Sequence, residues 1–177
     1  IMGMQTDVKS SHTNQSGFLV LGRNRLKGFL AISGTSAGTV NVWDTTTAPV
    51  AVTYGRAGTL ITVTLASHGL VTGQVVGLTF APASGTSATN GNYVVTVLTS
   101  STYTVTDINT GTIVAGTAAT QGTRWLTSFD TAAVLTSGSP QTVYCIVPGE
   151  GMLVLNGLYA QMSNQDSFTP TRRVMKS

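Results

Sequence analysis

Charged side chains are scarce in this sequence. Lys, Arg, Asp and Glu together make up 8% of the 177 residues, whereas soluble domains typically carry about 25%. The nine Lys and Arg, six Asp and Glu and two His residues are few for an active site, which needs several ionisable groups in one place. Because isolated soluble proteins usually spread charge over their surface, we expect other subunits to cover much of the surface of this one.

Other absences narrow the class of protein further. The single cysteine, Cys145, excludes an internal disulfide and hence a secreted disulfide scaffold; in its apolar surroundings we expect it to act as a small buried hydrophobic residue. No stretch approaches about 20 apolar residues, so we expect no membrane span. The polar first 16 residues lack the order of a signal peptide, and the absence of heptads excludes a coiled coil.

The abundant residues favour β structure. The sequence holds 31 threonines and 20 glycines, and 41% of its residues are hydrophobic, which is enough to build a core and disfavours disorder. Branched side chains such as Thr pack well on a pleated sheet. Short runs alternate between apolar and polar residues, and no window of eleven or more residues has the apolar spacing of a helix. We therefore predict an all-β fold.

A change of composition along the chain predicts two units. We expect residues 1–16 to form an extended N-terminal arm, and residues 17–54 and 123–177 to form a jelly-roll-like β-sandwich. Residues 55–122 alternate more cleanly and are expected to form a small antiparallel β domain inserted into the sandwich. Such an insertion is tolerated because a longer loop adds little entropic penalty. Within it, Asp107–Gly111 has the residues of a hairpin connection.

Four segments of the insert carry recognisable motifs in a fixed order. The expected strand Ile61–Thr64 comes first, and a turn with the residues His-Gly-Leu follows within Ser67–Val76. Two further expected strands are Thr89–Val95, with the motif Asn-Gly-x-Tyr, and Ser101–Val105, with the motif Thr-Tyr-Thr-Val. This series resembles a small β domain common in phage tail and virion proteins. The module is sometimes labelled as similar to the first catalytic-cysteine half-domain of ubiquitin-activating enzymes, without implying that chemistry. The resemblance implies a domain that acts as a spacer within a virion protein or as a decoration on it.

The flanking residues carry a second set of motifs. They are Asp7–His12, Arg23–Gly28, Ser36–Val40 before Trp43, and Val147–Leu153 before Asn156–Tyr159. These pieces resemble small structural proteins of short-tailed marine phages. The resemblance implies a virion component, located on the capsid surface or the tail and made in the host cytoplasm. Such parts are expected to be homo-oligomers with cyclic symmetry.

Residues that could carry chemistry are isolated from one another. His68 has no second His, Cys or carboxylate near it in the sequence, which favours a turn histidine bonded to backbone over a metal ligand. Gly149–Gly151 lacks the Lys and the helix of a phosphate loop and is typical of a tight turn. No nucleophile elbow or paired carboxylates are found. We expect no enzymatic activity, no cofactor and no metal.

Two groups of cations lie near opposite ends of the sequence. They are Arg23, Arg25 and Lys27, and Arg172, Arg173 and Lys176. A spacing of two puts the first group on one face of a strand. The favoured interpretation is docking on an acidic neighbouring subunit. A solvated strand face and nucleic-acid binding, which needs a broad basic face, are the alternatives. All six can act together only if the fold unites the two groups.

Two tryptophans, Trp43 and Trp125, flank the insert in the sequence. Packing in the core or in an interface is the favoured interpretation. The alternative is a stacking platform for sugars, as in a receptor-binding module.

Taken together, the residues and the resemblances predict a non-enzymatic bacteriophage structural protein. The leading hypothesis is a capsid decoration or cement protein that stabilises the head by subunit–subunit contacts. The alternative is a tail component, such as a ring, adaptor or fibre-base protein, with binding of host-surface glycans as a further option. The expected partners are other virion proteins, either the major capsid protein or tail proteins, and further copies of the chain, with no membrane and with nucleic acid disfavoured.

Overall fold

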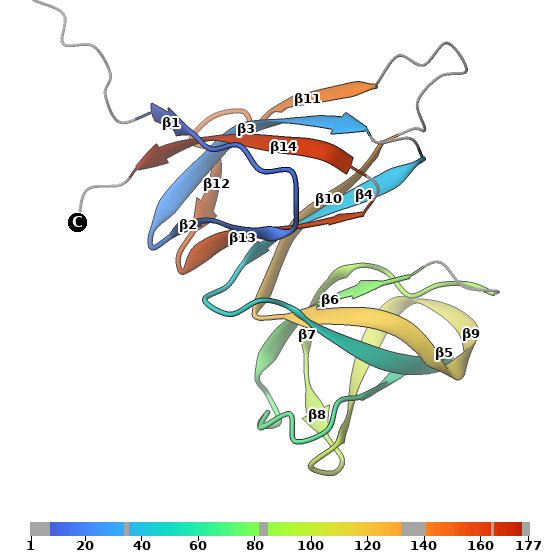
Figure 1. Ribbon diagram of the computed structural model, residues 1–177. Helices are drawn as coiled ribbons and strands as arrows, with labels where there is room; N and C mark the ends of the chain where they lie inside the picture. Colours follow the sequence, from blue (N-terminus) through green and yellow to red (C-terminus); the bar gives the residue numbers. More distant parts are fainter. Residues whose placement is uncertain (1–7, 34–35, 82–84, 132–140, 164, 175–177) are drawn as a thin grey trace, which may run out of the picture. The chain divides into compact units, whose positions relative to one another are not determined.

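The computed structural model describes residues 8–33, 36–81, 85–131, 141–163 and 165–174. All the regular secondary structure in these ranges is β-strand, with no helix among the described residues. This confirms the all-β prediction. The chain divides into two compact units (Figure 1): unit 1 comprises Ile1–Thr46 and Leu126–Ser177, and unit 2 comprises Thr47–Trp125. No helix in the described ranges is long and apolar enough to cross a lipid bilayer.

Unit 1 contains two sheets. Sheet A has the strand order β1-β14-β3-β11, and β12 also pairs with β3; sheet B has the order β10-β4-β13-β2. The strands of sheet A are β1 (Val8–Ser10), β3 (Asn24–Ser33), β11 (Thr142–Ile146), β12 (Met152–Val154) and β14 (Gln165–Val174). The strands of sheet B are β2 (Gly17–Leu21), β4 (Gly38–Asp44), β10 (Arg124–Thr131) and β13 (Gly157–Ser163).

The core of unit 1 lies between these two sheets, which form two layers in Figure 1. Val40 and Val42 of β4 face the core from sheet B, because a strand turns alternate side chains to one face. Phe29 and Phe168 come from sheet A, and their rings lie 5.8 Å apart between centroids. Two sheets that share a core in this way form a β-sandwich; its jelly-roll-like connection stays a prediction.

Unit 2 is a single bent sheet, sheet C, with the order β5-β9-β6-β7 and with β8 paired to β9. Its strands are β5 (Val50–Thr64), β6 (Val75–Phe80), β7 (Gly91–Val94), β8 (Thr96–Val97) and β9 (Thr102–Gly122). The long strands β5 and β9 shift register between Tyr54 and Arg56 and between Gly58 and Leu60. Such bulges bend a strand, so the sheet curves around its own core, which includes Ile61.

The observed boundaries of the two units differ from the expected ones. The expected boundary between residues 54 and 55 falls inside β5, and unit 2 begins at Thr47 and ends at Trp125. The hairpin connection expected at Asp107–Gly111 is wrong, since β9 continues through these residues.

The described part of the N-terminal arm expected over residues 1–16 is extended and pairs with sheet A. β1 pairs with β14, and an isolated bridge joins Thr13 to Phe168. The backbone N–H of Ser11 also donates to the carbonyl of Pro170. This segment joins sheet A because β14 offers it an edge of backbone donors and acceptors. Residues 1–7 lie outside the described ranges.

Candidate docking face on sheet A

The two cationic residues of strand β3, Arg25 and Lys27, face away from the core of unit 1. Arg25 and Lys27 are half-buried and alternate with Leu26, which is fully buried in the core. Successive side chains of a strand point to opposite faces. Both cations therefore lie on the outer face of sheet A.

A β-bulge brings apolar side chains to this same outer face. Beyond the cations, the buried core residues of β3 are Phe29 and Ala31, so the alternation of burial changes phase along the strand. The pairing of β3 with β14 shifts register at the same place. An extra residue moves the side chains that follow it to the opposite face. The half-buried Leu30 and Ile32 therefore join the cations on the outer face.

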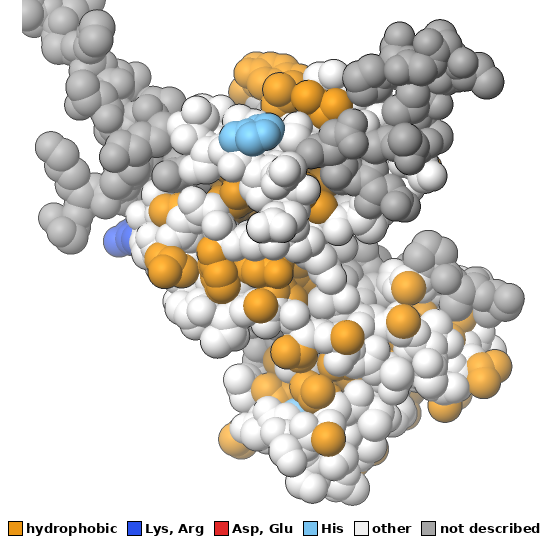
Figure 2. Space-filling model, in the orientation of Figure 1, with side chains coloured by type: hydrophobic (Ala, Val, Ile, Leu, Met, Phe, Trp, Pro, Cys, Tyr) orange, Lys and Arg blue, Asp and Glu red, His pale blue; other side chains and the backbone are white. Residues whose placement is uncertain are grey.

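Strand β11 adds two exposed hydrophobic side chains beside them. Tyr144 is 67% exposed and Ile146 is 65% exposed, whereas Cys145 between them is half-buried, not fully buried as expected, and packs against the core. Tyr144 lies opposite Leu30 in the β11–β3 pairing, and residues opposite one another share a face of the sheet. Figure 2 shows a group of hydrophobic side chains, in orange, where β11 lies in Figure 1.

We name this surface the sheet A face. It comprises Arg25, Lys27, Leu30, Ile32, Tyr144 and Ile146.

The two cations of the sheet A face hold the turn between β11 and β12. Nζ of Lys27 donates to the carbonyl of Gly149 at 2.6 Å, and Nη1 of Arg25 donates to the carbonyl of Glu150 at 3.3 Å. Gly149 and Gly151 have φ angles of 62° and 79°, so the predicted tight turn is confirmed. Because main-chain carbonyls carry no net charge, these contacts orient both cations without neutralising them.

The fold also brings the backbone of Arg172 and Arg173 to this end of sheet A. In the backbone pairing of β14 with β3, Arg173 lies opposite Arg25 and Arg172 lies opposite Leu26. On the other side of β14, Lys9 of β1 lies opposite Arg172. The backbone of Arg172 and Arg173, distant in the sequence, thus lies beside that of Arg25 and Leu26 in one sheet.

Two of the predicted docking residues, Arg23 and Lys176, lie outside strands β3 and β14 as the structure describes them. Arg23 is exposed and immediately precedes β3. Lys176 lies outside the described residues.

The two tryptophans do not form an open stacking platform. Trp43 is 0% exposed, which agrees with the favoured interpretation of packing in the core and leaves no ring face open to a sugar. Trp125 is half-buried, and its backbone N–H and carbonyl are both bonded to the side-chain amide of Asn92 at 2.8 Å. The alternation of β4 explains the burial of Val40 and Val42 on the core face, but it does not predict that Trp43 is buried too.

His68 is a turn histidine, as predicted. Its Nδ1 accepts the backbone N–H of Leu70 at 3.0 Å, and its Nε2 donates to the carbonyl of Thr99 at 2.9 Å. One ring nitrogen accepts and the other donates, so the backbone holds both ring nitrogens of the turn histidine. The ring also packs edge-on against Tyr103, with 5.4 Å between the ring centroids.

Sequence reasoning missed a buried ion pair in unit 2. Nη2 of Arg56 lies 3.1 Å from Oδ2 of Asp107, and the two side chains are 0% and 1% exposed. The guanidinium also donates to the main-chain carbonyls of Gly58, Thr86, Ser87 and Asn109. A signal was present, because the only charged residues between Thr47 and Trp125 are Arg56, Asp107 and Arg124. A lone acid in a largely apolar unit that also holds two Arg residues favours a pair.

Asp107 is held as a carboxylate by its hydrogen bonds. Burial alone would raise the pKa of Asp107, but hydrogen bonds from Thr89, Ile108 and Asn109 outweigh burial and hold the pKa below its ordinary value of 3.8. Burial, followed by the nearby charge of Asp107, raises the pKa of Tyr93 to about 12. The Tyr93 hydroxyl is therefore protonated at neutral pH and donates to the carbonyl of Thr89.

The role of this pair is structural. The guanidinium of Arg56 joins β5 to β9 and to the segment before β7, which explains why β9 runs through the expected hairpin. Within the described ranges, no group of three or more His, Cys, Asp or Glu residues is placed to hold a metal ion.

The chain matches no family model, no curated protein and no solved structure.

The sheet A face is suited to protein contact. It combines exposed apolar side chains, including an aromatic one, with cations at one end. Tyr and Arg are enriched where proteins bind one another, because they offer large contact area together with hydrogen-bond donors.

Proposed function

We propose that this protein is a non-enzymatic structural subunit of a bacteriophage virion, a decoration or cement protein that stabilises the capsid by subunit–subunit contacts. One observation carries the proposal: the sheet A face sets Arg25 and Lys27 on the same outer face as the exposed Tyr144 and Ile146. The resemblance of the flanking motifs to small structural proteins of short-tailed phages supports the same assignment.

The partner that fits this face is an acidic protein surface with an apolar centre. Burying Tyr144 and Ile146 favours contact by about 25 cal/mol per Å² of apolar area, before the large entropic penalty of association. The charges of Arg25 and Lys27 would select an acidic neighbour and speed the encounter. We propose the major capsid protein or another virion protein as this neighbour, with further copies of the chain completing a cyclic oligomer.

Unit 2 supports the proposal through its lack of surface charge. Of its three charged residues, Arg56 and Asp107 are paired with one another in the interior. Figure 2 shows mainly white and orange side chains over the described residues. A surface with so little charge is poorly suited to remaining dispersed in water and well suited to burial against other subunits.

Rebinding to particles that lack the protein tests the apolar part of the sheet A face. The double variant Tyr144→Ser, Ile146→Thr should lower occupancy roughly tenfold, because it removes the exposed apolar area at the centre of the contact. The matched control is Ile108→Thr, Val114→Thr, which changes two residues of unit 2 that are 86% and 80% exposed. Densitometry of purified particles gives the occupancy.

The cations are tested in the same assay. Replacing Arg25 and Lys27 by Ala should weaken rebinding at low ionic strength, and the loss should shrink as added salt screens the charges. Replacing Arg124 by Ala controls for a change of net charge elsewhere. Wild-type occupancy for both sheet A face variants would overturn the docking proposal.

Copy number separates the leading proposal from its alternative. The resemblance of the insert to modules of phage tails favours the tail as the second location. A cryo-EM map of the particle would show a shell-wide lattice of copies for a capsid decoration protein, but a single ring for a tail component.

A further inference from the structure

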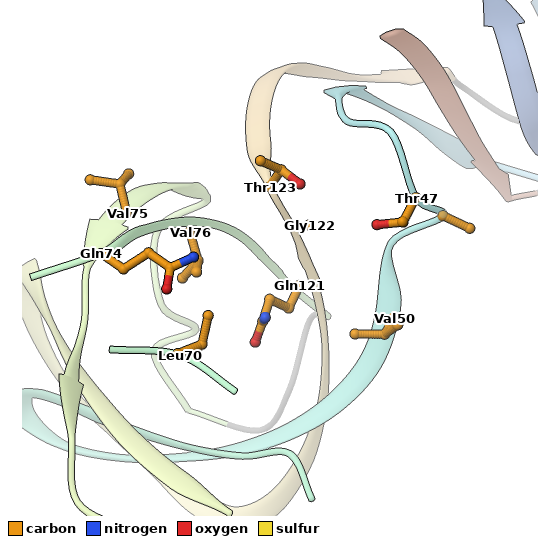
Figure 3. Close-up of a pocket in the computed structure, with 10 residues that line it drawn as sticks. Thr47, Val50, Leu70, Gln74, Val75, Val76, Gln121, Gly122 and Thr123 are labelled. Carbon is orange, nitrogen blue, oxygen red and sulfur yellow. The ribbon is translucent and has the colours of Figure 1, made fainter. Parts of the chain in front are cut away.

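Unit 2 contains a recess at one end of its core, formed entirely by its own residues (Figure 3). Its volume is about 150 Å³. Its apolar wall includes Val50 of β5, Val76 of β6 and Leu70, which lies between these two strands in the sequence. Gln74 and Gln121 supply its amide groups. None of the residues that line it is charged or aromatic.

The two glutamines have oxygens that are already engaged. Oε1 of Gln74 accepts the backbone N–H of Val71 at 3.3 Å, and Oε1 of Gln121 accepts the hydroxyl of Tyr103. Figure 3 draws both side chains among the residues that line the recess. Neither Nε2 group donates to another residue in the described part of the chain, so the recess presents two unused amide donors.

Exposed valines lie beside the recess. Val75 and Val94 are opposite one another in the β6–β7 pairing and are 49% and 62% exposed. In the described ranges, β7 is the last strand on its side of sheet C. An exposed edge strand with β-branched side chains is a template for a further strand.

We propose that this recess binds an uncharged, extended peptide segment of a neighbouring subunit. The segment places a short apolar side chain against Val50, Leu70 and Val76 and offers main-chain carbonyls to the amides of Gln74 and Gln121. A charged segment is disfavoured because it would lose hydration and find no counter-charge. A sugar is disfavoured because no aromatic ring lines the recess for stacking. The proposal uses none of the residues of the sheet A face.

Titration of the ¹⁵N-labelled full-length protein with a neutral peptide tests this proposal. The probe is acetyl-Thr-Val-Thr-Val-Thr-amide, observed through the side-chain N–H signals of Gln74 and Gln121. We expect saturable shifts of both signals. The variant Val75→Lys should weaken binding roughly tenfold, because it places a charge beside the apolar site. Ile108→Lys, at a residue that is 86% exposed outside the lining of the recess, should leave binding unchanged.

Three results would overturn the proposal. They are the absence of saturable shifts, equal binding of a peptide with Asp in place of Val, and larger shifts with glucose than with the peptide, which would mark a sugar site. The Tyr144→Ser, Ile146→Thr variant should bind the peptide like the wild type, so failure here and failure of sheet A docking are distinguishable.

Discussion

At the scale of single residues, Arg56 and Asp107 determine how unit 2 holds its long strands together. Two buried ions are unfavourable unless each is paired and fully hydrogen-bonded. Here the guanidinium donates to four main-chain carbonyls and the carboxylate accepts N–H groups of Thr89 and Ile108. The pair therefore acts as a cross-link between segments that are distant in the sequence.

Replacing Asp107 by Asn should destabilise unit 2 by about 3–5 kcal/mol at neutral pH, because the buried guanidinium loses its counter-charge. The pKa of Asp107 is lower in the folded protein than its ordinary 3.8, so the stability that its charge contributes is complete above that value. This contribution disappears as the pH falls through the folded-state pKa. Urea unfolding followed by hydrogen exchange in unit 2, at neutral and strongly acidic pH, measures both effects.

Asp130 provides the control for this experiment. Its side chain is exposed and accepts the hydroxyl of Thr39 at 2.9 Å, so Asp130→Asn should change stability by less than about 1 kcal/mol. A difference between wild type and Asp107→Asn that stays constant with pH would contradict the assignment.

At the scale of elements, the turn between β11 and β12 links local conformation to the sheet A face. Its carbonyls orient Arg25 and Lys27, and its glycines adopt φ angles that other residues rarely do. The two glycines differ in their surroundings. A Cβ on Gly151 would lie 2.5 Å from the carbonyl oxygen of Leu26, whereas a Cβ on Gly149 would meet nothing within 4 Å.

Gly149→Ala should therefore cost about 1–2 kcal/mol, the strain of the left-handed backbone alone. Gly151→Ala should cost more, because β3 or the turn must also move to relieve the clash. Thermal unfolding of the two variants side by side measures the difference. Equal losses of stability in the two variants would show that β3 or the turn moves to accommodate the new Cβ of residue 151 without a measurable penalty.

The exposed pair on β11 shows what an apolar run reveals about a strand. Gln141–Val147 is such a run, which predicts a strand but does not tell which face the core covers. Cys145 packs inward because β11 adds to the edge of β3, with Cys145 opposite Phe29. Tyr144 and Ile146 consequently face outward.

At the scale of the whole molecule, each unit has its own hydrophobic core. The core of unit 1 lies between sheets A and B, and that of unit 2 lies within the curve of sheet C. Units with separate cores can unfold as separate cooperative blocks.

We predict that a core substitution in one unit lowers protection in that unit alone. Leu158 of unit 1 and Leu78 of unit 2 form a matched pair, at 1% and 0% exposure. Each change to Ala should cost about 2–5 kcal/mol, measured by hydrogen exchange of peptides from both units during urea unfolding. Loss of protection throughout the chain for either variant would mean that the two units unfold as one block.

Local pattern accounts for the parts of the candidate site that depend on nearby residues. The strand of Arg25 and Lys27, the tight turn at Gly149–Gly151 and the turn role of His68 were all predictable, because alternation and turn chemistry act within a few residues. The exposure of Tyr144 was not, since it depends on the neighbour to which β11 pairs.

By itself, the amino-acid sequence determined that this chain is all-β and poor in charge, because side-chain branching and a period of two favour strands wherever they occur. Only the tertiary structure decided that Arg173 lies opposite Arg25, that Arg56 pairs with Asp107 and that Trp43 is buried. The reason is physical: strand register and burial arise from contacts between segments far apart in the chain, and a shift of one residue exchanges the two faces of a strand.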